Sequence, residues 1–223
     1  MGSASWWRRW LRNLGEILFF IALGLVIRFY VFQPFVVNGG SMCPTLNQYG
    51  EECRMSKGET VFLNAFVYTF LHTPERGDIV VFQPPGEDAY MQRRILGMPL
   101  RVKKYYIKRV IGLPGDTITL RNGQVYLTNS VYQDVQLTES YLSERNAGHT
   151  QAYGKDTFVV PEGHYMVMGD NRAKSQDSRM CFSSRCTEGS EAFVPEERIQ
   201  GRAEAVMWPL GRLRGFSTPS MGL

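Results

Sequence analysis

Residues 106–120 read YIKRVIGLPGDTITL and contain a strand pattern, a turn signal and a second strand pattern in direct succession. The run from Tyr105 to Ile111 is rich in β-branched and aromatic residues, which favour strands. Pro114, Gly115 and Asp116 are typical of a tight turn. The strand pattern then resumes at 117–120. This stretch predicts antiparallel β-structure.

The same alternation of short β-rich runs and turn signals continues in both directions. Further strands are predicted at 60–63, 78–82, 124–127, 157–160 and 165–168. Asn122-Gly123 separates two of these runs, and this dipeptide is a strong hairpin signal. Helical periodicity is weak after the N-terminal segment. We therefore expect a mostly β, antiparallel body.

The composition excludes several classes of protein. Of 223 residues, 43% are hydrophobic and 21% charged, which is enough apolar material for a core and excludes a wholly disordered chain. The net charge of +4 suits an anionic membrane surface as well as a nucleic acid. Four cysteines without C-x-x-C spacing argue against a zinc site, and we expect neither a metal nor a cofactor.

The N-terminus has the pattern of a membrane anchor. Residues 1–13 form a basic tail with three arginines and no acid, and residues 14–32 are largely apolar. A run of that length can span a bilayer as one transmembrane helix, which Gln33-Pro34 would end. A cleaved signal peptide, for which no small-x-small site is present, and a buried core helix are the alternatives.

The charge of the tail predicts the orientation of the anchor. Basic residues favour the cytoplasmic side, so the N-terminus would be cytoplasmic and the rest extracytoplasmic. No second apolar run of similar length follows, so we expect a single pass through the cell (inner) membrane. An extracytoplasmic domain can form disulfides.

Ser41 is a candidate nucleophile close to the membrane exit. It follows Gly39 and Gly40, which let the backbone approach a ligand closely, although Gly-Gly-Ser is by itself usually a turn or linker. None of the three histidines stands in a recognisable triad motif. Cys43 is a rival nucleophile, or else a small buried residue.

Lys108 is the candidate base inside a predicted strand. A lysine acts as a base only as the free amine, which requires removal from water. Strand alternation places Lys108 on one face with Tyr106 and Val110, an apolar setting. The alternative is a solvated lysine on an edge strand, which would discourage aggregation.

Four further segments stand out by composition. Residues 169–179 are densely polar directly after an apolar strand, and Asp177 and Arg179 are expected to brace each other. Residues 128–156 read as a loop-rich insertion, and 209–223 as a frayed tail. The basic run between 89 and 115 fits a solvated loop, anionic headgroups or a nucleic acid.

Four segments, in this order along the chain, resemble the sequence boxes of bacterial type I signal peptidases: 41–46, 76–80, 106–116 and 169–179. The resemblance implies a membrane-bound Ser/Lys serine endopeptidase that removes signal peptides from exported preproteins. Ser41 would be the nucleophile, Lys108 the general base, and Ser175 would orient the Lys108 amine. The remaining box residues would brace or shape the site: Gly169, Asp170, Asn171, Asp177 and Arg179.

The resemblance also implies a domain plan. A signal-peptidase-like catalytic β domain would span 33–116 and 161–208, with a smaller β region inserted at 117–160. The partners would be signal peptides and the lipid bilayer, without nucleic acid. A peptidase dedicated to one secretion or pilus system, and a catalytically idle membrane-anchored binding module, remain alternatives.

Two features depart from the family pattern. Many Gram-negative members carry a serine two residues before the nucleophile, whereas this chain has Gly39, so we expect Gly39→Ser to be tolerated. The segment from Cys181 to Ala192 reads as an insertion, and we expect Cys181 to bond Cys186 rather than Cys43 or Cys53.

Overall fold

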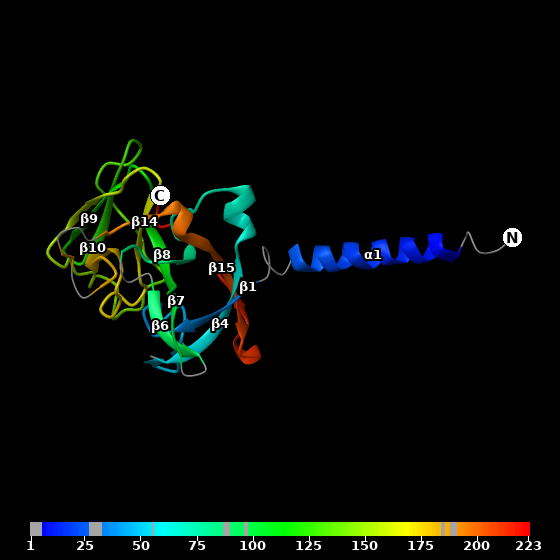
Figure 1. The fold of residues 1–223 in the computed structure, drawn as a ribbon. Coiled ribbons are helices and arrows are strands. Elements are labelled where there is room, and N and C mark those ends of the chain that lie inside the picture. The colour runs from blue at the N-terminus through cyan, green and yellow to red at the C-terminus, as the bar shows by residue number, and fades with distance from the viewer. Residues whose placement is uncertain are drawn as a thin grey trace.

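The computed structural model describes residues 6–26, 33–54, 56–86, 90–95, 98–183, 186–187 and 191–223. A β body carries a single long helix, α1 (Trp6–Val26), which projects away from it (Figure 1). The paired strands are all antiparallel, so the predicted fold class of the body is confirmed.

The largest sheet has eight strands and contains the chain segments on which the candidate residues stand. Its order is β1 (Gln33–Asn38), β4 (Lys57–Asn64), β15 (Ile199–Trp208), β5 (Ile79–Phe82), β8 (Tyr106–Gly112), β13 (His164–Met168) and β14 (Val194–Pro195). A short strand, β16 (Arg214–Gly215), pairs with β15 outside this path. The two neighbours of β8 in the sheet therefore come from either side of it in the sequence, β5 before it and β13 after it.

A second sheet lies between β8 and β13 in the sequence. It has four strands, in the order β11 (Val135–Gln136), β10 (Gln124–Thr128), β9 (Thr117–Arg121) and β12 (Thr157–Val159). Asn122-Gly123 joins β9 to β10 with both residues at positive φ, as a two-residue hairpin requires. Buried side chains from this sheet and from β8 and β13 share one core: Ile111, Ile118, Leu127, Phe158 and Met166.

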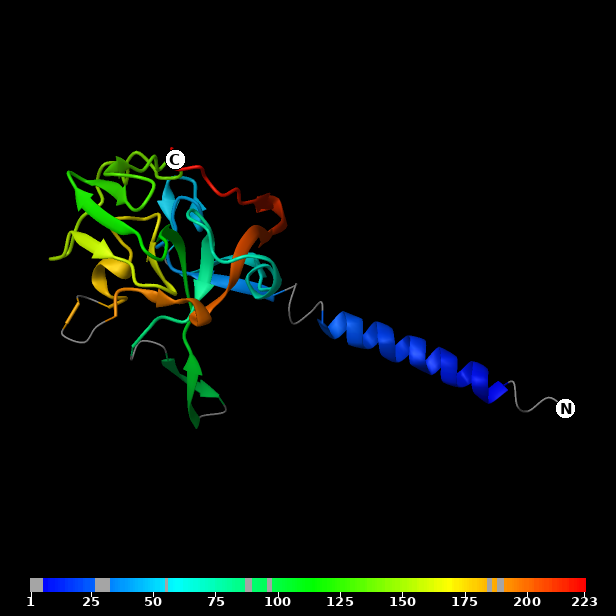
Figure 2. The ribbon, with the colours of Figure 1, turned by 90° about the horizontal axis from the view of Figure 1, so that it is seen from above.

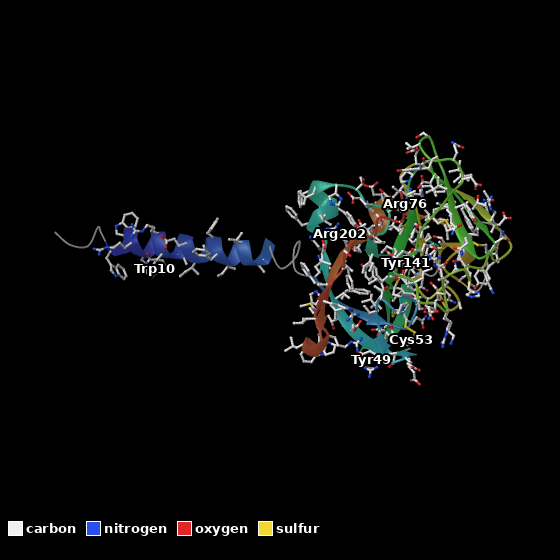
Figure 3. The ribbon with its side chains drawn as sticks, turned by 180° about the vertical axis from the view of Figure 1, so that it is seen from behind. Trp10, Tyr49, Cys53, Arg76, Tyr141 and Arg202 are labelled. Carbon is white, nitrogen blue, oxygen red and sulfur yellow. A yellow bond between two sulfur atoms is a disulfide. The ribbon has the colours of Figure 1, made fainter. Side chains whose placement is uncertain are left out.

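Two hairpins extend the body. The small pair β2 (Gln48–Tyr49) and β3 (Glu52–Cys53) follows the Ser41 turn, and Tyr49 and Cys53 lie together at one edge of the body in Figure 3. The longer pair β6 (Tyr90–Ile95) and β7 (Met98–Lys103) is a two-stranded ribbon that projects from the body (Figure 2). A π-helical turn, η2 (Val67–Leu71), and three 3₁₀ turns, η4 (Ser178–Met180), η5 (Glu196–Arg198) and η6 (Leu210–Arg212), complete the described elements.

The helix differs from the predicted transmembrane segment in its bounds. It begins at Trp6, within the predicted basic tail, and Trp10 lies near its far end in Figure 3. The predicted span ran to residue 32, and its last part, 27–32, lies outside the described residues. Within the described ranges, no helix has both the length and the apolar character that crossing a membrane requires.

The C-terminal segment contradicts the expectation of a frayed tail. Met221 is 2% exposed and packs in the core of the four-stranded sheet, and its carbonyl accepts a hydrogen bond from Thr138 N at 2.8 Å. Thr218 Oγ1 donates to Asp78 Oδ1 at 2.9 Å. The prediction of a frayed tail over 209–223 is therefore wrong, because a few side chains anchor an otherwise loop-like stretch across both sheets.

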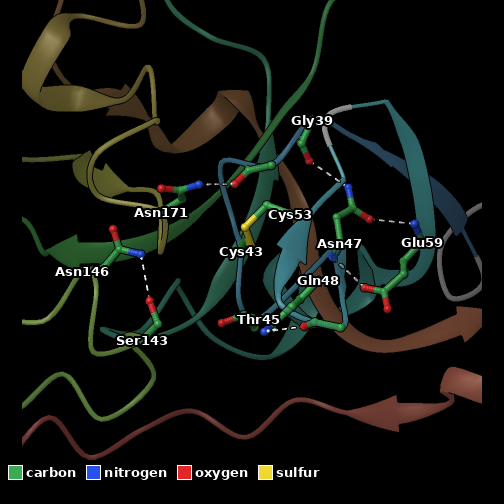
Figure 4. The surroundings of a disulfide bond; sticks show 12 residues. Gly39, Cys43, Thr45, Asn47, Gln48, Cys53, Glu59, Ser143, Asn146 and Asn171 are labelled. Carbon is green, nitrogen blue, oxygen red and sulfur yellow. Dashed lines mark hydrogen bonds between the residues drawn. A yellow bond between two sulfur atoms is a disulfide. The ribbon is translucent and has the colours of Figure 1, made fainter.

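The four cysteines form two disulfides. The predicted bond between Cys181 and Cys186 is present, and Cys43 is bonded to Cys53 (Figure 4). With its sulfur in a disulfide, Cys43 is no thiolate nucleophile.

Replacing Met221 with Ala tests the anchoring of the C-terminal segment. Loss of a fully buried side chain should lower the free energy of unfolding by about 2 kcal/mol or more. Leu223→Ala is the matched control, because Leu223 is 41% exposed, and it should change stability by about 0.5 kcal/mol or less. Urea unfolding of the purified chain gives both values, and equal stability of the two variants would contradict the anchoring.

Candidate functional site

Lys108 stands on an interior strand rather than on an edge. Its strand, β8, pairs with β5 on one side and β13 on the other, and Lys108 is 4% exposed. Val80, opposite Lys108 in the register, and Val110, on the same face, are fully buried. The alternative of a solvated edge-strand lysine is therefore wrong.

The Lys108 amine meets the Ser41 hydroxyl. Lys108 Nζ lies 2.8 Å from Ser41 Oγ and donates to Ile107 O at 3.0 Å. Burial lowers the pKa of Lys108 to about 8, although the carboxylates of Asp177 and Asp170 act in the opposite direction. At pH 7 about a tenth of this amine is therefore free, and the free amine accepts the Ser41 O–H.

The turn that carries Ser41 is held by the polar segment 169–179. Asn171 donates twice to it, from its backbone N to Ser41 O and from Nδ2 to Gly40 O, both at 3.0 Å. The second of these bonds is drawn in Figure 4. Thr45 Oγ1 donates to Asp170 Oδ2 at 2.5 Å. The segment 169–179, more than a hundred residues further along the chain, thus fixes the backbone around Ser41.

Asp170 is itself fixed by a buried arginine. Arg109 donates to the two carboxylate oxygens of Asp170, from Nε at 2.9 Å and from Nη2 at 2.7 Å, and its Nη1 donates to Gly77 O at 2.8 Å. Arg109 is 3% exposed and Asp170 fully buried. Arg109 is adjacent to Lys108 on β8, so its side chain lies on the opposite face of the strand. Its role was not predicted from the sequence.

The predicted brace between Asp177 and Arg179 is present. Arg179 donates from Nε and Nη2 to the two oxygens of Asp177, each at 2.9 Å, and both residues are fully buried. Burial alone would raise the pKa of Asp177, but the charge and hydrogen bonds of Arg179 and the Gly169 N–H outweigh it and hold the pKa below its ordinary value. Asp177 is therefore a carboxylate at neutral pH.

Ser41 and Ser175 both lie close to the backbone of Gly169. A Cβ at this position would lie 2.2 Å from Ser175 Oγ and 2.4 Å from Ser41 O, so only glycine fits. Ser175 Oγ is buried and lies close enough to Asp177 to help lower the pKa of that carboxyl, but among the described residues it forms no hydrogen bond to the Lys108 amine. The expected hydrogen bond from Ser175 to the Lys108 amine is thus not formed here, and its orienting role stays a prediction.

Arg172 was also missed by the sequence analysis. It forms a buried ion pair with Glu139 of the inserted region, and it donates from Nη1 to Thr150 Oγ1 at 2.6 Å and from Nε to Gly169 O at 3.2 Å. These contacts join the polar loop to the smaller sheet. No signal in the sequence pairs Arg172 with Glu139, because the two lie far apart along the chain.

A cleft of about 260 Å³ opens beside the Ser41–Lys108 contact. The apolar and aromatic residues that line it include Phe35, Val36, Tyr106 and Ile107, and the exposed Lys174 and Gln176 line it as well. In the part of the chain that the structure describes, no three His, Cys, Asp or Glu side chains are grouped as metal ligands. The cleft can accept a short extended peptide segment.

The backbone conformation of Gly39 bears on the expected tolerance of Gly39→Ser. Gly39 has a φ of +86°, a conformation that side chains rarely adopt, although nothing lies within 4 Å of a Cβ built there. An L-residue in this region costs about 1–2 kcal/mol. Gly39→Ser would therefore meet backbone strain rather than lack of space, and its tolerance stays a prediction.

Comparison with known proteins gives one consistent result. A family model described as signal peptidase, peptidase S26, matches residues 7–208. A signal peptidase I of Bacillus amyloliquefaciens is 31% identical over 198 residues, covering 89% of this chain and 85% of the relative. A probable signal peptidase I-1 of Synechocystis is 33% identical over 207 residues, with 92% and 86% covered.

Among solved structures, a signal peptidase I from Enterococcus faecalis is similar. It shares 30% sequence identity, with a TM-score of 0.39, and the match covers 59% of this chain and 97% of that one.

Proposed function

This chain belongs to the signal peptidase family, peptidase S26, as a signal peptidase I serine peptidase, and we propose that it removes signal peptides from exported preproteins with Ser41 as nucleophile and Lys108 as general base. The observation that carries the assignment of the two residues is the 2.8 Å contact between Ser41 Oγ and the buried Lys108 Nζ. The four sequence boxes that carry the resemblance supply both groups.

The chemistry follows from the free amine of Lys108. As Ser41 Oγ attacks the carbonyl carbon of the scissile peptide bond, Lys108 Nζ takes the hydroxyl proton, and a tetrahedral intermediate forms. The resulting ammonium gives that proton to the leaving amine nitrogen, which breaks the C–N bond and leaves an acyl ester on Ser41. A water molecule then attacks the ester, its proton passes through Lys108 to Ser41 Oγ, and the signal peptide leaves as a carboxylic acid.

The negative charge that develops on the carbonyl oxygen requires fixed donors. We assign the Ser41 backbone N–H to this role, since the two hydrogen bonds from Asn171 hold the Gly40 and Ser41 carbonyls and thereby the peptide unit between these residues. Gly39 contributes no side-chain hydroxyl, so a second donor would come from backbone or water.

The substrate is an extended segment bound at the edge of the sheet. The edge strand β1 supplies Phe35 and Val36 to the cleft, and β8 supplies Tyr106 and Ile107. An extended peptide can pair its backbone with such an edge while alternate side chains enter the cleft. The small, largely apolar cleft fits the small uncharged residues that the family resemblance implies before the cleavage site.

Replacing Ser41 with Ala or Lys108 with Met should abolish cleavage of a preprotein while the β fold remains intact. Each change removes one of the two reacting groups. The replacing side chains, Ala at position 41 and Met at position 108, are small or apolar enough to be accommodated. Lys104→Met is the matched control, because Lys104 lies just before β8, with its Nζ 4.8 Å from the centroid of the Tyr106 ring, and does not contact Ser41. Mass spectrometry of the products measures the rate, and a Lys108→Met protein with a tenth of the parental rate would contradict the assignment.

The rate should depend on pH through the Lys108 amine. Because burial lowers the pKa of Lys108 to about 8, the charged, inactive form dominates below this value and the free base above it. We expect kcat/KM to fall about tenfold for each pH unit well below the pKa and to reach a plateau above it. Return of activity after transfer from each pH to pH 8 controls for denaturation, and a flat profile between about pH 6 and 9 is the opposing result.

We further propose that the N-terminal segment attaches the enzyme to the cell membrane, with the β body on the extracytoplasmic side. The proposal rests on the apolar sequence of 14–32 and on the exposed aromatic and aliphatic residues along α1, such as Trp10, Ile17 and Phe20. The elements η2 and β15 carry two further exposed aromatic side chains, Phe70 and Trp208.

A protease-accessibility experiment tests this orientation. In spheroplasts that express the full chain, protease added outside the cells should digest the β body, because it would lie outside the membrane. A cytoplasmic protein serves as the control for intact membranes. Protection of the β body until detergent is added would refute the proposed orientation.

A further inference from the structure

The C-terminal segment also contacts the Ser41 turn. Arg214, the first residue of β16, donates from Nη2 to Thr45 O at 2.7 Å, four residues after Ser41. The sequence boxes do not include this arginine, which lies in the stretch predicted to be a frayed tail. Arg214 therefore contacts the nucleophile turn from a part of the chain with no assigned role.

Arg214 also holds a buried carboxylate. Glu59, on β4, is fully buried, and it accepts hydrogen bonds from Arg214 Nη1 and Nη2 at 2.8 Å each and from Arg212 Nε at 2.6 Å. Burial alone would raise the pKa of Glu59, but hydrogen bonds from Arg214, the Asn47 N–H and Arg212 outweigh it and hold the pKa below its ordinary value. Glu59 is thus an ionised acceptor whose charge needs these arginines.

Glu59 in turn fixes the end of the turn. Its Oε2 accepts from the Asn47 backbone N at 2.9 Å, and its backbone N donates to Asn47 Oδ1 at 2.7 Å (Figure 4). Asn47 Nδ2 closes the turn by donating to Gly39 O at 2.8 Å, also drawn in Figure 4. Asn47 has a φ of +61°, and a Cβ at Gly58 would lie 2.0 Å from Asn47 Oδ1, so this arrangement leaves little freedom.

These contacts form a chain from the C-terminal segment to both ends of residues 39–47. One branch runs from Arg214 directly to Thr45 O, and the other runs through Glu59 and Asn47 to Gly39 O. Ser41 lies between the two attachment points. A small displacement of a reacting group can cost about a hundredfold in rate, so what fixes this turn affects the chemistry.

We propose that Arg214 is a positioning residue that, through Thr45 and Glu59, holds the Ser41 hydroxyl at reacting distance from Lys108. The proposal rests on the assignment of Ser41 and Lys108 made above, and it gives the C-terminal segment a part in turnover. Arg214 touches neither the cleft beside Ser41 nor the Lys108 amine; it acts only through the turn.

The test compares the kinetics of Arg214→Ala, Arg214→Lys and the parent full-length enzyme on one preprotein. We expect Arg214→Ala to lower kcat about tenfold or more and to leave KM within about twofold, because the cleft is unchanged while the nucleophile is displaced. Arg214→Lys should have an intermediate kcat, because one ammonium can neutralise Glu59 but cannot also bridge to Thr45 O in the same geometry.

Arg202→Ala is the matched control for loss of a partly exposed arginine. Arg202 lies on β15, pairs with Glu204 at 2.9 Å and with the buried Asp78 at 3.6 Å, and does not contact the Ser41 turn. Its kcat should stay within about twofold of the parent. Near-UV circular dichroism gives the folded fraction of each variant, by which kcat is corrected, and Arg214→Lys carries the test if Arg214→Ala does not fold.

Three results would overturn the proposal: a corrected kcat of Arg214→Ala within twofold of the parent, a loss confined to KM, or an equal loss of kcat in Arg202→Ala.

Lys108→Met, measured in parallel, separates this proposal from the proposed function. If Lys108→Met is inactive and folded Arg214→Ala is fully active, only the positioning role fails. If Lys108→Met is active, the assignment of the base fails first.

Discussion

The burial of one amine on an interior strand is the constraint on which the site depends. Removing Lys108 from water disfavours its charged form, and this is what makes a lysine usable as a base near neutral pH. The same burial would be costly without partners, and the amine has two, Ser41 Oγ and Ile107 O. The large sheet provides the setting, because β5 and β13 cover both edges of β8.

Beyond the apolar neighbours of this amine, ion pairs to buried carboxylates hold the loops around it. Arg109 pairs with Asp170, Arg179 with Asp177, and Glu59 with Arg214, and each carboxylate also accepts a hydrogen bond from another part of the chain. Buried pairs of this kind add little net stability, but removing one partner is strongly destabilising. Their consequence here is geometric, since each carboxylate can bond its partners only when the Ser41 turn and the loops around it have one arrangement.

The strands that the sequence predicted are those with strong apolar runs. β5, β8 and β13 were expected because their β-branched and aromatic residues are buried on both faces of the sheet. β15 was not expected, although it lies between β4 and β5, because its inward side carries small residues such as Ala203 and its other positions include Arg202 and Glu204. A strand of this composition is stabilised by its neighbours more than by its own propensity.

Sequence alone determined the class of the fold, the Asn122-Gly123 hairpin and, through the boxes, the family and the two residues assigned to the reaction. These depend on local propensity or on motifs whose residues are close along the chain. Only the tertiary structure decided that Lys108 is interior, that Gly39 has a positive φ, and that Arg109, Arg172 and Arg214 hold the loops around Ser41. The physical reason is that an arginine's partner is chosen by which segments the sheet brings together, and the spacing of charges along the chain carries no record of that choice.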